Sequence, residues 1–345
     1  MSSEKGTMGG EQYAFRYNRK DLILYALSIG MGSRDDDDVK DNLRFLYEGH
    51  PRFSSLPTFC LAFTFWSNQR HRDQTSGRIP RFPPPLMAAE EVIPQRFQRG
   101  NVELKARPII HTWQSIEWQK SLPIGDENGC AIDTFTDLDI ILLQPKSIGT
   151  FVTSQSKIMY KAASSNQKEL LCTMQSTALV LGIAKDIVSA YDSGIAKLTS
   201  APKIPEDTRP LLEWTYHTAP NQALLYRLAS GDSNHIHVDT SASEMMGSDK
   251  KAPILHGLFT LAVAFRGLLK VVPDADQRIR KLEARFTQPA FVGDALVVKI
   301  WKTRNSPIEF VFTVTNKEFG VVVVDNGFAQ MSSIVAKSSI NLSRL

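Results

Sequence analysis

Hydrophobic and polar positions follow two periods along this chain, and both halves use them in the same order. Apolar residues spaced three and four apart predict helices, and runs that alternate or stay apolar for a few residues predict strands. In the first half these patterns place helices at 21–28, 39–47 and 57–66, and strands at 109–118, 139–143, 151–160 and 170–180. In the second half they place a short apolar segment at 222–228, a long helix at 253–271, and strands at 282–286, 295–302, 308–315 and 321–334.

A faint internal repeat links the two halves. Residues 24–30 match residues 225–231, and residues 122–126 match residues 290–294 in the same order. Each half is therefore expected to be one long helix with an antiparallel sheet, which is an α+β unit used twice. Because a sheet wrapped on one helix buries only part of that helix, pairing two units would close the core and leave a cleft between them.

Polar stretches rich in glycine and proline set the expected domain boundaries. Residues 1–14 are polar and Gly-rich, which predicts a disordered terminus. Prolines interrupt a loose pattern in residues 185–209, which predicts a linker. The two units would then cover residues 15–184 and 210–336, and a tail would follow at 337–345.

Composition narrows the class of protein. The 345 residues are enough for two domains. With 40 basic and 36 acidic residues, the net charge of +4 makes no case for nucleic-acid binding. Three widely separated cysteines form no disulfide scaffold or common zinc spacing and favour a reducing compartment. No apolar run is long enough for a membrane span, and no secretory signal is expected. The aspartates at 35–38 are expected to form a solvated turn rather than a metal site.

The chain ends in a tripeptide of the kind that addresses proteins to an organelle. Ser343, Arg344 and Leu345 resemble the Ser-Lys-Leu peroxisomal address, with arginine keeping the positive charge. A terminus that ends in these residues by chance is the competing interpretation. The address interpretation predicts a peroxisomal protein whose import receptor is a partner, with no insertion into a membrane.

The densest group of reactive side chains lies at residues 230–237, in the sequence Ser-Gly-Asp-Ser-Asn-His-Ile-His. If this turn folds back, the carboxylate of Asp232 and the imidazole of His237 can together hold a water molecule. Asn234 could orient that water or the carboxylate. The competing interpretation is an ordinary Asx turn before a strand, with its histidines on the surface.

A second group lies at residues 253–260, where Gly257 opens an apolar helix. Backbone N–H groups at a helix start are unpaired, and a glycine lets a ligand approach them closely. Such a group can stabilise the negative charge of a thioester enolate, as an oxyanion hole does. The competing interpretation is a small residue placed there for packing.

These two segments together resemble a known family. Residues 226–237 resemble the hydratase 2 motif of the MaoC-like dehydratases, and residues 253–260 resemble the helix-opening segment of that family at the expected distance. Residues 21–32, 43–49 and 56–59 look like the N-terminal half of the eukaryotic peroxisomal type 2 enoyl-CoA hydratases. The resemblance covers residues 15–336.

The resemblance implies a double hot-dog fold and the reversible hydration of trans-2-enoyl-CoA to (3R)-3-hydroxyacyl-CoA in fatty-acid β-oxidation. It assigns the catalytic pair to Asp232 and His237, with Asn234 in support and Gly257 at the oxyanion position. The first half has Gly30 but no Asp-x-Asn-x-x-His motif. That half is therefore expected to be catalytically empty and to shape the acyl-chain cavity.

The motif departs from the family pattern at three positions. Ala229 looks like an inserted residue, Ser233 replaces what is often a bulky side chain, and His235 stands where the family usually has proline. The loop thereby loses a fixed φ angle and gains a titratable ring. These changes bear on loop rigidity and substrate preference more than on the catalytic pair.

The resemblance also sets the expected ligands. The CoA thioester is the substrate, and no metal or redox cofactor is expected because no electron is transferred. The candidate substrate-binding residues are His256, Lys250, Lys251 and Arg285, the basic ones for the CoA phosphates, although solvated surface charges are the competing interpretation. A homodimer is expected by family analogy. The alternative functions are a non-catalytic acyl-CoA-binding protein and a related hot-dog dehydratase or thioesterase.

Overall fold

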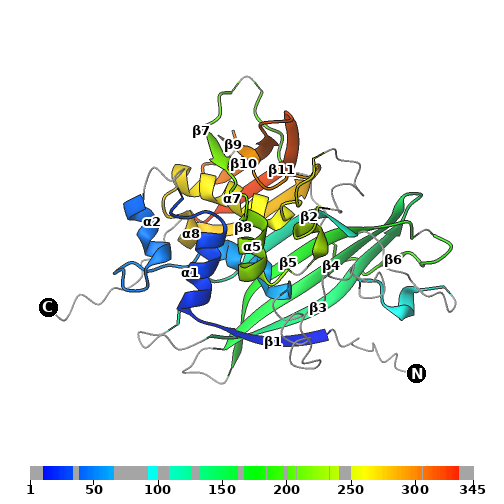
Figure 1. Cartoon of the computed structure of the whole chain (residues 1–345). Coiled ribbons are helices and arrows are strands. Elements are labelled where there is room, and N and C mark those ends of the chain that lie inside the picture. Colours follow the sequence, from blue (N-terminus) through cyan, green and yellow to red (C-terminus); the bar gives the residue numbers. More distant parts are fainter. Residues whose placement is uncertain are drawn as a thin grey trace.

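A single antiparallel sheet with helices in front of it dominates the computed structural model (Figure 1). The structure describes residues 11–33, 39–65, 92–99, 109–125, 132–161, 167–183, 185–196, 201–206, 208–232, 234–240, 250–304 and 306–333. The strands are β1 (Glu11–Tyr17), β2 (Ile109–Trp118), β3 (Ile132–Pro145), β4 (Gly149–Lys161), β5 (Lys168–Leu181), β6 (Tyr191–Asp192), β7 (Leu212–His217), β8 (Ile279–Phe286), β9 (Ala295–Lys302), β10 (Glu309–Asn316) and β11 (Val321–Met331). The helices are α1 (Arg19–Ser28), α2 (Val39–Leu46), α5 (Gln222–Ser230), α7 (Gly257–Val271) and α8 (Ala275–Arg278), with 3₁₀ turns η1 (Pro57–Ala62), η2 (Gln95–Phe97) and η3 (His235–His237).

The two halves of the chain share this sheet. Its strand order is β1-β3-β4-β5-β2-β8-β11-β10-β9-β7, with β6 paired to β3. The halves meet where β2 pairs with β8, in a register that sets Ser115 opposite Glu283 and Ile116 opposite Leu282. Each half has a short edge strand that leads into a helix, β1 into α1 and β7 into α5. The halves are therefore joined edge to edge through backbone hydrogen bonds.

Helix α7 forms the centre of the second half. Its sequence is apolar on all sides, as expected of a helix buried on every face, and every residue from Leu258 to Leu268 is buried. It packs on β7, β9, β10 and β11. A Cβ at Gly267 would lie 2.9 Å from Val298 Cγ1, so this glycine lets the helix approach β9 closely. The helix begins at Gly257 rather than at Pro253, where the sequence pattern placed its start.

The first half has no matching long helix among the described residues. The helix expected at 57–66 is wrong for Pro57–Ala62, which form the 3₁₀ turn η1 with no side-chain cap at its start. Threonine, phenylalanine and cysteine in this turn have lower helix propensity than the alanines and leucines of α7. All six residues of η1 are buried, so tertiary packing holds a conformation that the local sequence favours only weakly.

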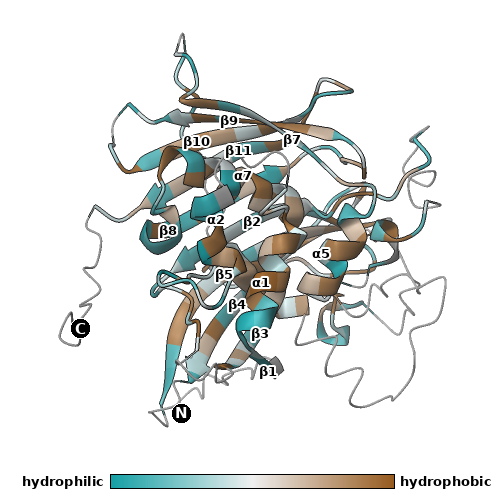
Figure 2. Ribbon diagram, turned by 60° about the vertical axis from the view of Figure 1, so that its left-hand side comes forward, coloured by the Kyte–Doolittle hydropathy of each residue, from teal (hydrophilic) through white to brown (hydrophobic). Residues whose placement is uncertain are grey.

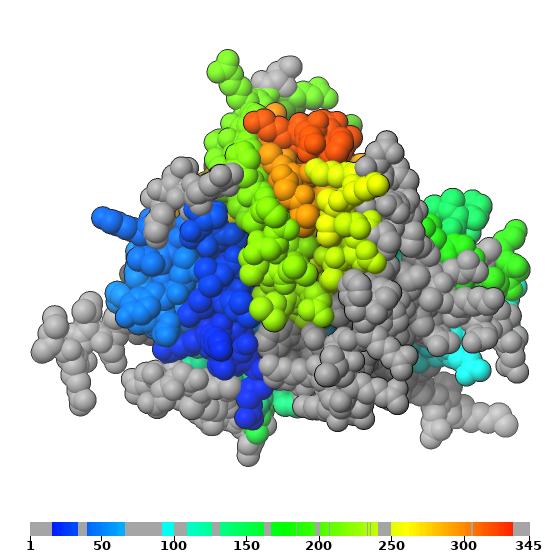
Figure 3. Space-filling view, in the orientation of Figure 1, coloured from blue at the N-terminus to red at the C-terminus, as the bar shows by residue number. Residues whose placement is uncertain are grey.

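Helices α1 and α5 carry the first matching pair of repeat segments, and they lie side by side (Figures 1 and 2). The surface view shows the same neighbourhood, with α5 directly against α1 (Figure 3). Each helix is followed by a glycine with a positive φ angle, +86° at Gly30 and +72° at Gly231. Two hydrogen bonds cross between the halves here, from Gln222 Nε2 to the carbonyl of Ser28 (2.6 Å) and from Arg266 Nη1 to the carbonyl of Ile29 (2.9 Å).

Several boundaries differ from the sequence-based expectations. Residues 11–14, expected to be disordered, belong to β1 and pair with β3. The expected linker is partly tied to the first half, because Tyr191–Asp192 form β6 and Val188 bridges to Gln98. Helix α1 begins at Arg19 rather than at residue 21, because Asn18 caps it and Asp21 closes the capping box from inside the helix. The sheet register places these segments through distant partners, which local composition does not reveal.

Some expectations concern residues that the structure does not describe. These are the aspartates at 35–38 and the C-terminal residues 334–345. None of the helices in the described part of the chain has both the length and the apolarity needed to cross a bilayer.

Candidate active site

The C-terminal end of α5 and the N-terminal end of α7 carry the residues singled out from the sequence. Gly231 ends α5 in the left-handed conformation, and its N–H donates to the carbonyl of Arg227. The chain then turns, and Asp232 Oδ1 accepts a 3.0 Å hydrogen bond from the backbone N–H of Asn234. This is the Asx turn that the sequence left as a competing interpretation. It occupies only one carboxylate oxygen, so the other remains available to a second group.

The second carboxylate oxygen faces His237. Asp232 Oδ2 lies 3.9 Å from His237 Nε2, and the two side chains are 14% and 8% exposed. Nδ1 of His237 lies 2.8 Å from the carbonyl oxygen of Ile254. Because a carbonyl only accepts, Nδ1 carries the proton, and in the neutral ring Nε2 carries a lone pair. A distance of 3.9 Å is too long for a direct hydrogen bond and leaves two acceptors that a water molecule can bridge.

His256 forms the third part of this cluster. It is the N-cap residue of α7, is 2% exposed, and stacks on His237 with ring centroids 3.6 Å apart and 22° between the planes. Tyr226 packs at 4.8 Å from the same ring. Burial, and then the neighbouring His237, hold the pKa of His256 well below its usual 6.5. The ring is therefore neutral at physiological pH.

Asp232, His237 and His256 also raise the question of a metal ion, because one donor atom from each lies within 4.8 Å of the others. An imidazole binds a metal along its in-plane lone pair at about 2.0–2.1 Å. The two histidine rings are nearly parallel and 3.6 Å apart, so their lone pairs run side by side rather than toward one point. This geometry fits the metal poorly and suits proton transfer and hydrogen bonding.

Gly257 is the first residue of α7 and is half-buried. The first N–H groups of a helix have no partner within the helix and attract negative charge. A Cβ at this position would lie 3.1 Å from Cδ1 of Phe286, the last residue of β8. Phe286 in turn contacts the ring of His111 on β2, with centroids 4.8 Å apart. The first half of the molecule therefore reaches the site through His111.

Sequence reasoning missed His111 and Phe286. The junction of β2 with β8 brings these two rings together, and no local pattern reveals that junction. Tyr226 was part of the quoted motif but was given no role. Tyr226 follows Ala223 by three residues on the buried face of α5, and this spacing could have predicted that Tyr226 is buried near the site.

Asn234 lies in the loop, where it accepts hydrogen bonds from backbone N–H groups. Its carbonyl accepts the N–H of His237 at 3.2 Å, and its side-chain oxygen lies 3.5 Å from the N–H of Ile236. These bonds set the 3₁₀ turn that carries His237. The backbone of Ser233 and the side chain of His235 lie outside the described residues.

The basic residues expected at the CoA phosphates have different surroundings. Lys250 forms ion pairs with the buried carboxylate of Asp294 and with Glu318, the latter at 3.0 Å. Those carboxylates already hold the ammonium of Lys250, which disfavours the expected role at a phosphate. Lys251 and Arg285 are exposed, as a solvated surface charge would be.

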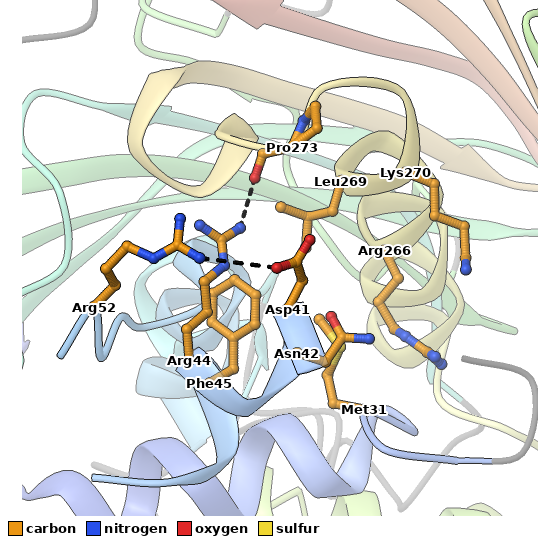
Figure 4. A pocket seen from close by; sticks show the side chains of 10 residues that line it. All are labelled: Met31, Asp41, Asn42, Arg44, Phe45, Arg52, Arg266, Leu269, Lys270 and Pro273. Carbon is orange, nitrogen blue, oxygen red and sulfur yellow. Dashed lines mark hydrogen bonds and ion pairs between the residues drawn. The ribbon is translucent and has the colours of Figure 1, made fainter. Parts of the chain in front are cut away.

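A pocket open to solvent lies at the other end of α7 (Figure 4). Its lining residues are Met31, Asp41, Asn42, Arg44, Phe45, Arg52, Arg266, Leu269, Lys270 and Pro273. Arg44 donates to the carbonyl of Pro273 at 2.6 Å and pairs with Asp276, and Arg266 donates to the carbonyl of Ile29. These guanidinium groups bind carbonyls at helix ends, where cations are favourable. The cavity is separate from the Asp232–His237 cluster.

Comparison with protein families gives two matches, one in each half. Residues 202–324 match the model described as "MaoC like domain". Residues 15–88 match the model described as "MFE-2 hydratase 2 N-terminal domain". The first range contains the whole cluster at the ends of α5 and α7.

Two curated relatives are similar over most of the chain. The "3-hydroxyacyl-thioester dehydratase Y" of Mycobacterium tuberculosis is 33% identical over 345 residues, which is 95% of this chain and 98% of that protein. "Enoyl-CoA hydratase 2, peroxisomal" of Arabidopsis thaliana is 29% identical over 294 residues, which is 83% of this chain and 82% of that protein.

A solved structure shows the same architecture. The MaoC-like dehydratase from Phytophthora capsici superimposes with a TM-score of 0.67 and 26% sequence identity, covering 94% of this chain and 96% of that one. This likeness confirms the α+β class and the double hot-dog architecture expected from the sequence.

Proposed function

The chain belongs to the family of MaoC-like dehydratases and type 2 enoyl-CoA hydratases, and from this premise we propose that it hydrates trans-2-enoyl-CoA reversibly to (3R)-3-hydroxyacyl-CoA. We further propose that Asp232 and His237 are its catalytic pair and that the N–H of Gly257 binds the thioester carbonyl. The observation that carries this assignment is the pair of acceptors, Asp232 Oδ2 and His237 Nε2, 3.9 Å apart. The hydrogen bond from His237 Nδ1 to Ile254 fixes which ring nitrogen accepts.

The geometry accounts for each step of the reaction. A substrate whose carbonyl oxygen accepts from the Gly257 N–H has its double bond polarised, so that C3 becomes electrophilic. A water molecule can donate one O–H to Asp232 Oδ2 and the other to His237 Nε2, with an oxygen lone pair free for C3. As the oxygen bonds to C3, one acceptor takes a proton and the electron pair of the double bond moves onto the carbonyl oxygen. The enolate then takes that proton at C2, which restores the pair.

The test is a hydration assay with purified protein and trans-2-enoyl-CoA. Wild-type protein should remove the enoyl absorbance and yield the (3R) product. Asp232→Asn keeps the size of the side chain and its Asx turn but removes the charged acceptor. General acid–base assistance contributes about 10²- to 10⁴-fold, so kcat should fall by that factor while the protein still binds substrate.

Asp139→Asn is a matched control, because Asp139 is an exposed residue of β3, and β4, β5 and β2 separate that strand from β8. It should keep wild-type kcat. Full activity in Asp232→Asn would remove Asp232 from the mechanism. Release of free CoA thiol would identify a thioesterase instead, and tight acyl-CoA binding without turnover would identify a binding protein.

We propose that the reaction serves fatty-acid β-oxidation in the peroxisome. The tripeptide Ser343, Arg344 and Leu345 supports this location, and one relative is named a peroxisomal hydratase. The proposal includes the import receptor as a partner and a homodimer as the assembly. A fusion that ends in these three residues should enter peroxisomes, and deletion of the three residues should leave it in the cytosol.

A further inference from the structure

The oxyanion position has a second polar group beside it. His256 directly precedes Gly257 and caps the same helix. Its side chain is 2% exposed, and neither ring nitrogen makes a hydrogen bond of good geometry with the described residues, although the backbone of Asp232 is a polar neighbour. A buried N–H without a partner destabilises a protein, and native structures rarely leave one unpaired. An imidazole kept in this state at the start of a helix therefore points to a ligand that completes it.

The unpaired ring is directed toward the reacting atoms. One nitrogen of His256 lies within 4.8 Å of both a carboxylate oxygen of Asp232 and a nitrogen of His237. Those two groups hold the attacking water in the proposed mechanism. The carbonyl oxygen and C3 of an enoyl thioester belong to one short conjugated unit. A group next to Gly257 that faces the water site is therefore within reach of the carbonyl.

The surroundings of His256 keep its ring neutral. His237 stacks on it, Tyr226 packs at 4.8 Å, and Arg227 and the backbone of Asp232 are the other polar groups that act on it. Burial, the nearby His237 and Arg227 lower its pKa, and the backbone of Asp232 offsets this only in part. The positive end of the α7 dipole also disfavours an imidazolium. A neutral imidazole held at a helix N-terminus is an effective group for polarising a carbonyl.

We propose that His256 is a second hydrogen-bond donor to the thioester carbonyl, alongside the N–H of Gly257. It is then a catalytic residue, because its N–H touches the oxygen on which negative charge develops. The ring transfers no proton, since the enolate is relieved when C2 takes the proton held by the catalytic pair. This inference rests on the proposed function and adds a donor to it.

A different role would be that of a spacer that only supports the ring of His237. His256→Phe separates the two roles, because phenylalanine preserves a flat ring for stacking but has no N–H. Loss of one oxyanion donor typically lowers kcat by about 10²- to 10³-fold. We expect that loss at every pH, with KM little changed and the pH optimum unmoved. His256→Gln, whose amide can donate, should recover part of the rate.

Tyr226→Phe is the matched control, since it keeps the ring that packs on His256 and removes a hydroxyl that the mechanism does not use. It should keep kcat within a few-fold of wild type. Near-wild-type kcat in His256→Phe would overturn the proposal and leave the spacer role. A shifted pH optimum with unchanged maximal rate would overturn it as well, since it would assign to His256 an effect on His237.

A binding measurement tests the same donor without turnover. Trans,trans-2,4-hexadienoyl-CoA bound to Asp232→Asn should show a red-shifted absorbance, because polarising the carbonyl draws charge along the diene. Adding His256→Phe should reduce this shift, and an unchanged shift would overturn the proposal. If wild-type protein failed to hydrate any enoyl-CoA, the proposed function would fail, yet this measurement would still decide the role of His256.

Nitrogen NMR covers the case in which the phenylalanine variant does not fold. In wild-type protein labelled with ¹⁵N at histidine, binding of a saturated acyl-CoA should move the His256 ring N–H proton downfield. An unmoved His256 resonance at saturating acyl-CoA would overturn the proposal.

Discussion

His111 shows how a single buried side chain links this fold to pH. Burial lowers its pKa from 6.5 to about 4, and its Nε2 lies 3.0 Å from the carbonyl of Trp113 and 2.9 Å from Ser176 Oγ. The ring also packs on Phe286, the neighbour of Gly257. The folded protein therefore keeps this imidazole uncharged at neutral pH.

Acid should destabilise the protein through this residue. Below pH 6.5 the unfolded chain binds a proton at His111, whereas the folded chain does not until about pH 4. The stability contribution is thus full above pH 6.5 and is lost as the pH falls from 6.5 to 4. His111→Gln should lose less stability across this window than wild type. Urea unfolding at pH 7 and pH 4.5 measures it, and equal losses in the two proteins would contradict the assignment.

At the residue scale, the sequence predicts the site residues whose conformation depends on residues close to them in the chain, and it misses those that depend on distant contacts. Asp232, His237 and Gly257 stand in short segments whose turn and helix start are local properties, and the structure brings them together. The ion pair of Lys250 could not be predicted locally, because its partner Asp294 is 44 residues further along. His111 was missed because it reaches the site only through the β2–β8 junction.

At the element scale, the way α5 ends determines where Asp232 points. Gly231 has a φ of +72°, a conformation that costs a residue with a Cβ about 1–2 kcal/mol. Gly231→Ala should therefore lower the free energy of unfolding by about that amount, and it should also lower kcat because the turn that presents Asp232 is displaced. Urea unfolding and the hydration assay together check this prediction.

Gly194 supplies the control for that substitution. Its φ is +76°, and a Cβ there would meet no heavy atom within 4 Å. Gly194→Ala should lower stability by a similar amount while leaving kcat unchanged. Equal loss of activity in both variants would mean that the Gly231 effect reflects stability alone.

Strands with clear alternation or apolar runs were predicted well, and edges and turns were not. Ile109–Trp118 and Ala295–Lys302 have the expected bounds. The pattern missed β1 and β7, which are short edge strands whose pairing partners lie far along the chain. It also predicted an α-helix at Pro57–Ala62, where the packing of six buried residues holds the 3₁₀ turn η1.

At the scale of the whole molecule, the halves should unfold together. The β2–β8 ladder, the bond from Gln222 to Ser28 and the bond from Arg266 to Ile29 all cross between them. Variants that retain the tryptophans of one half only report each half by fluorescence; these are Trp66, Trp113 and Trp118 in the first half and Trp214 and Trp301 in the second. Thermal unfolding should give coincident transitions in the two variants. Two separate transitions would show that the halves are independent.

The internal repeat and the family resemblance predict the overall architecture, but they do not predict the order of the strands in the sheet. The repeat placed α1 and α5 in corresponding positions, and these helices lie side by side. The order of strands depends on which edges meet, and many pairings satisfy the same hydrophobic pattern.

The two matching corners have a consequence for how this chain tolerates change. Gly30 and Gly231 turn the chain alike, but Met31 follows the first and Asp232 the second. Met31 lines the basic cavity at the far end of α7, whereas Asp232 faces His237. A duplicated module in one chain needs only one catalytic copy, and the first corner lacks the Asp-x-Asn-x-x-His motif. Side chains at this corner can then change without loss of the catalytic pair. The pocket lined by Met31 is therefore a place where a second activity could be engineered.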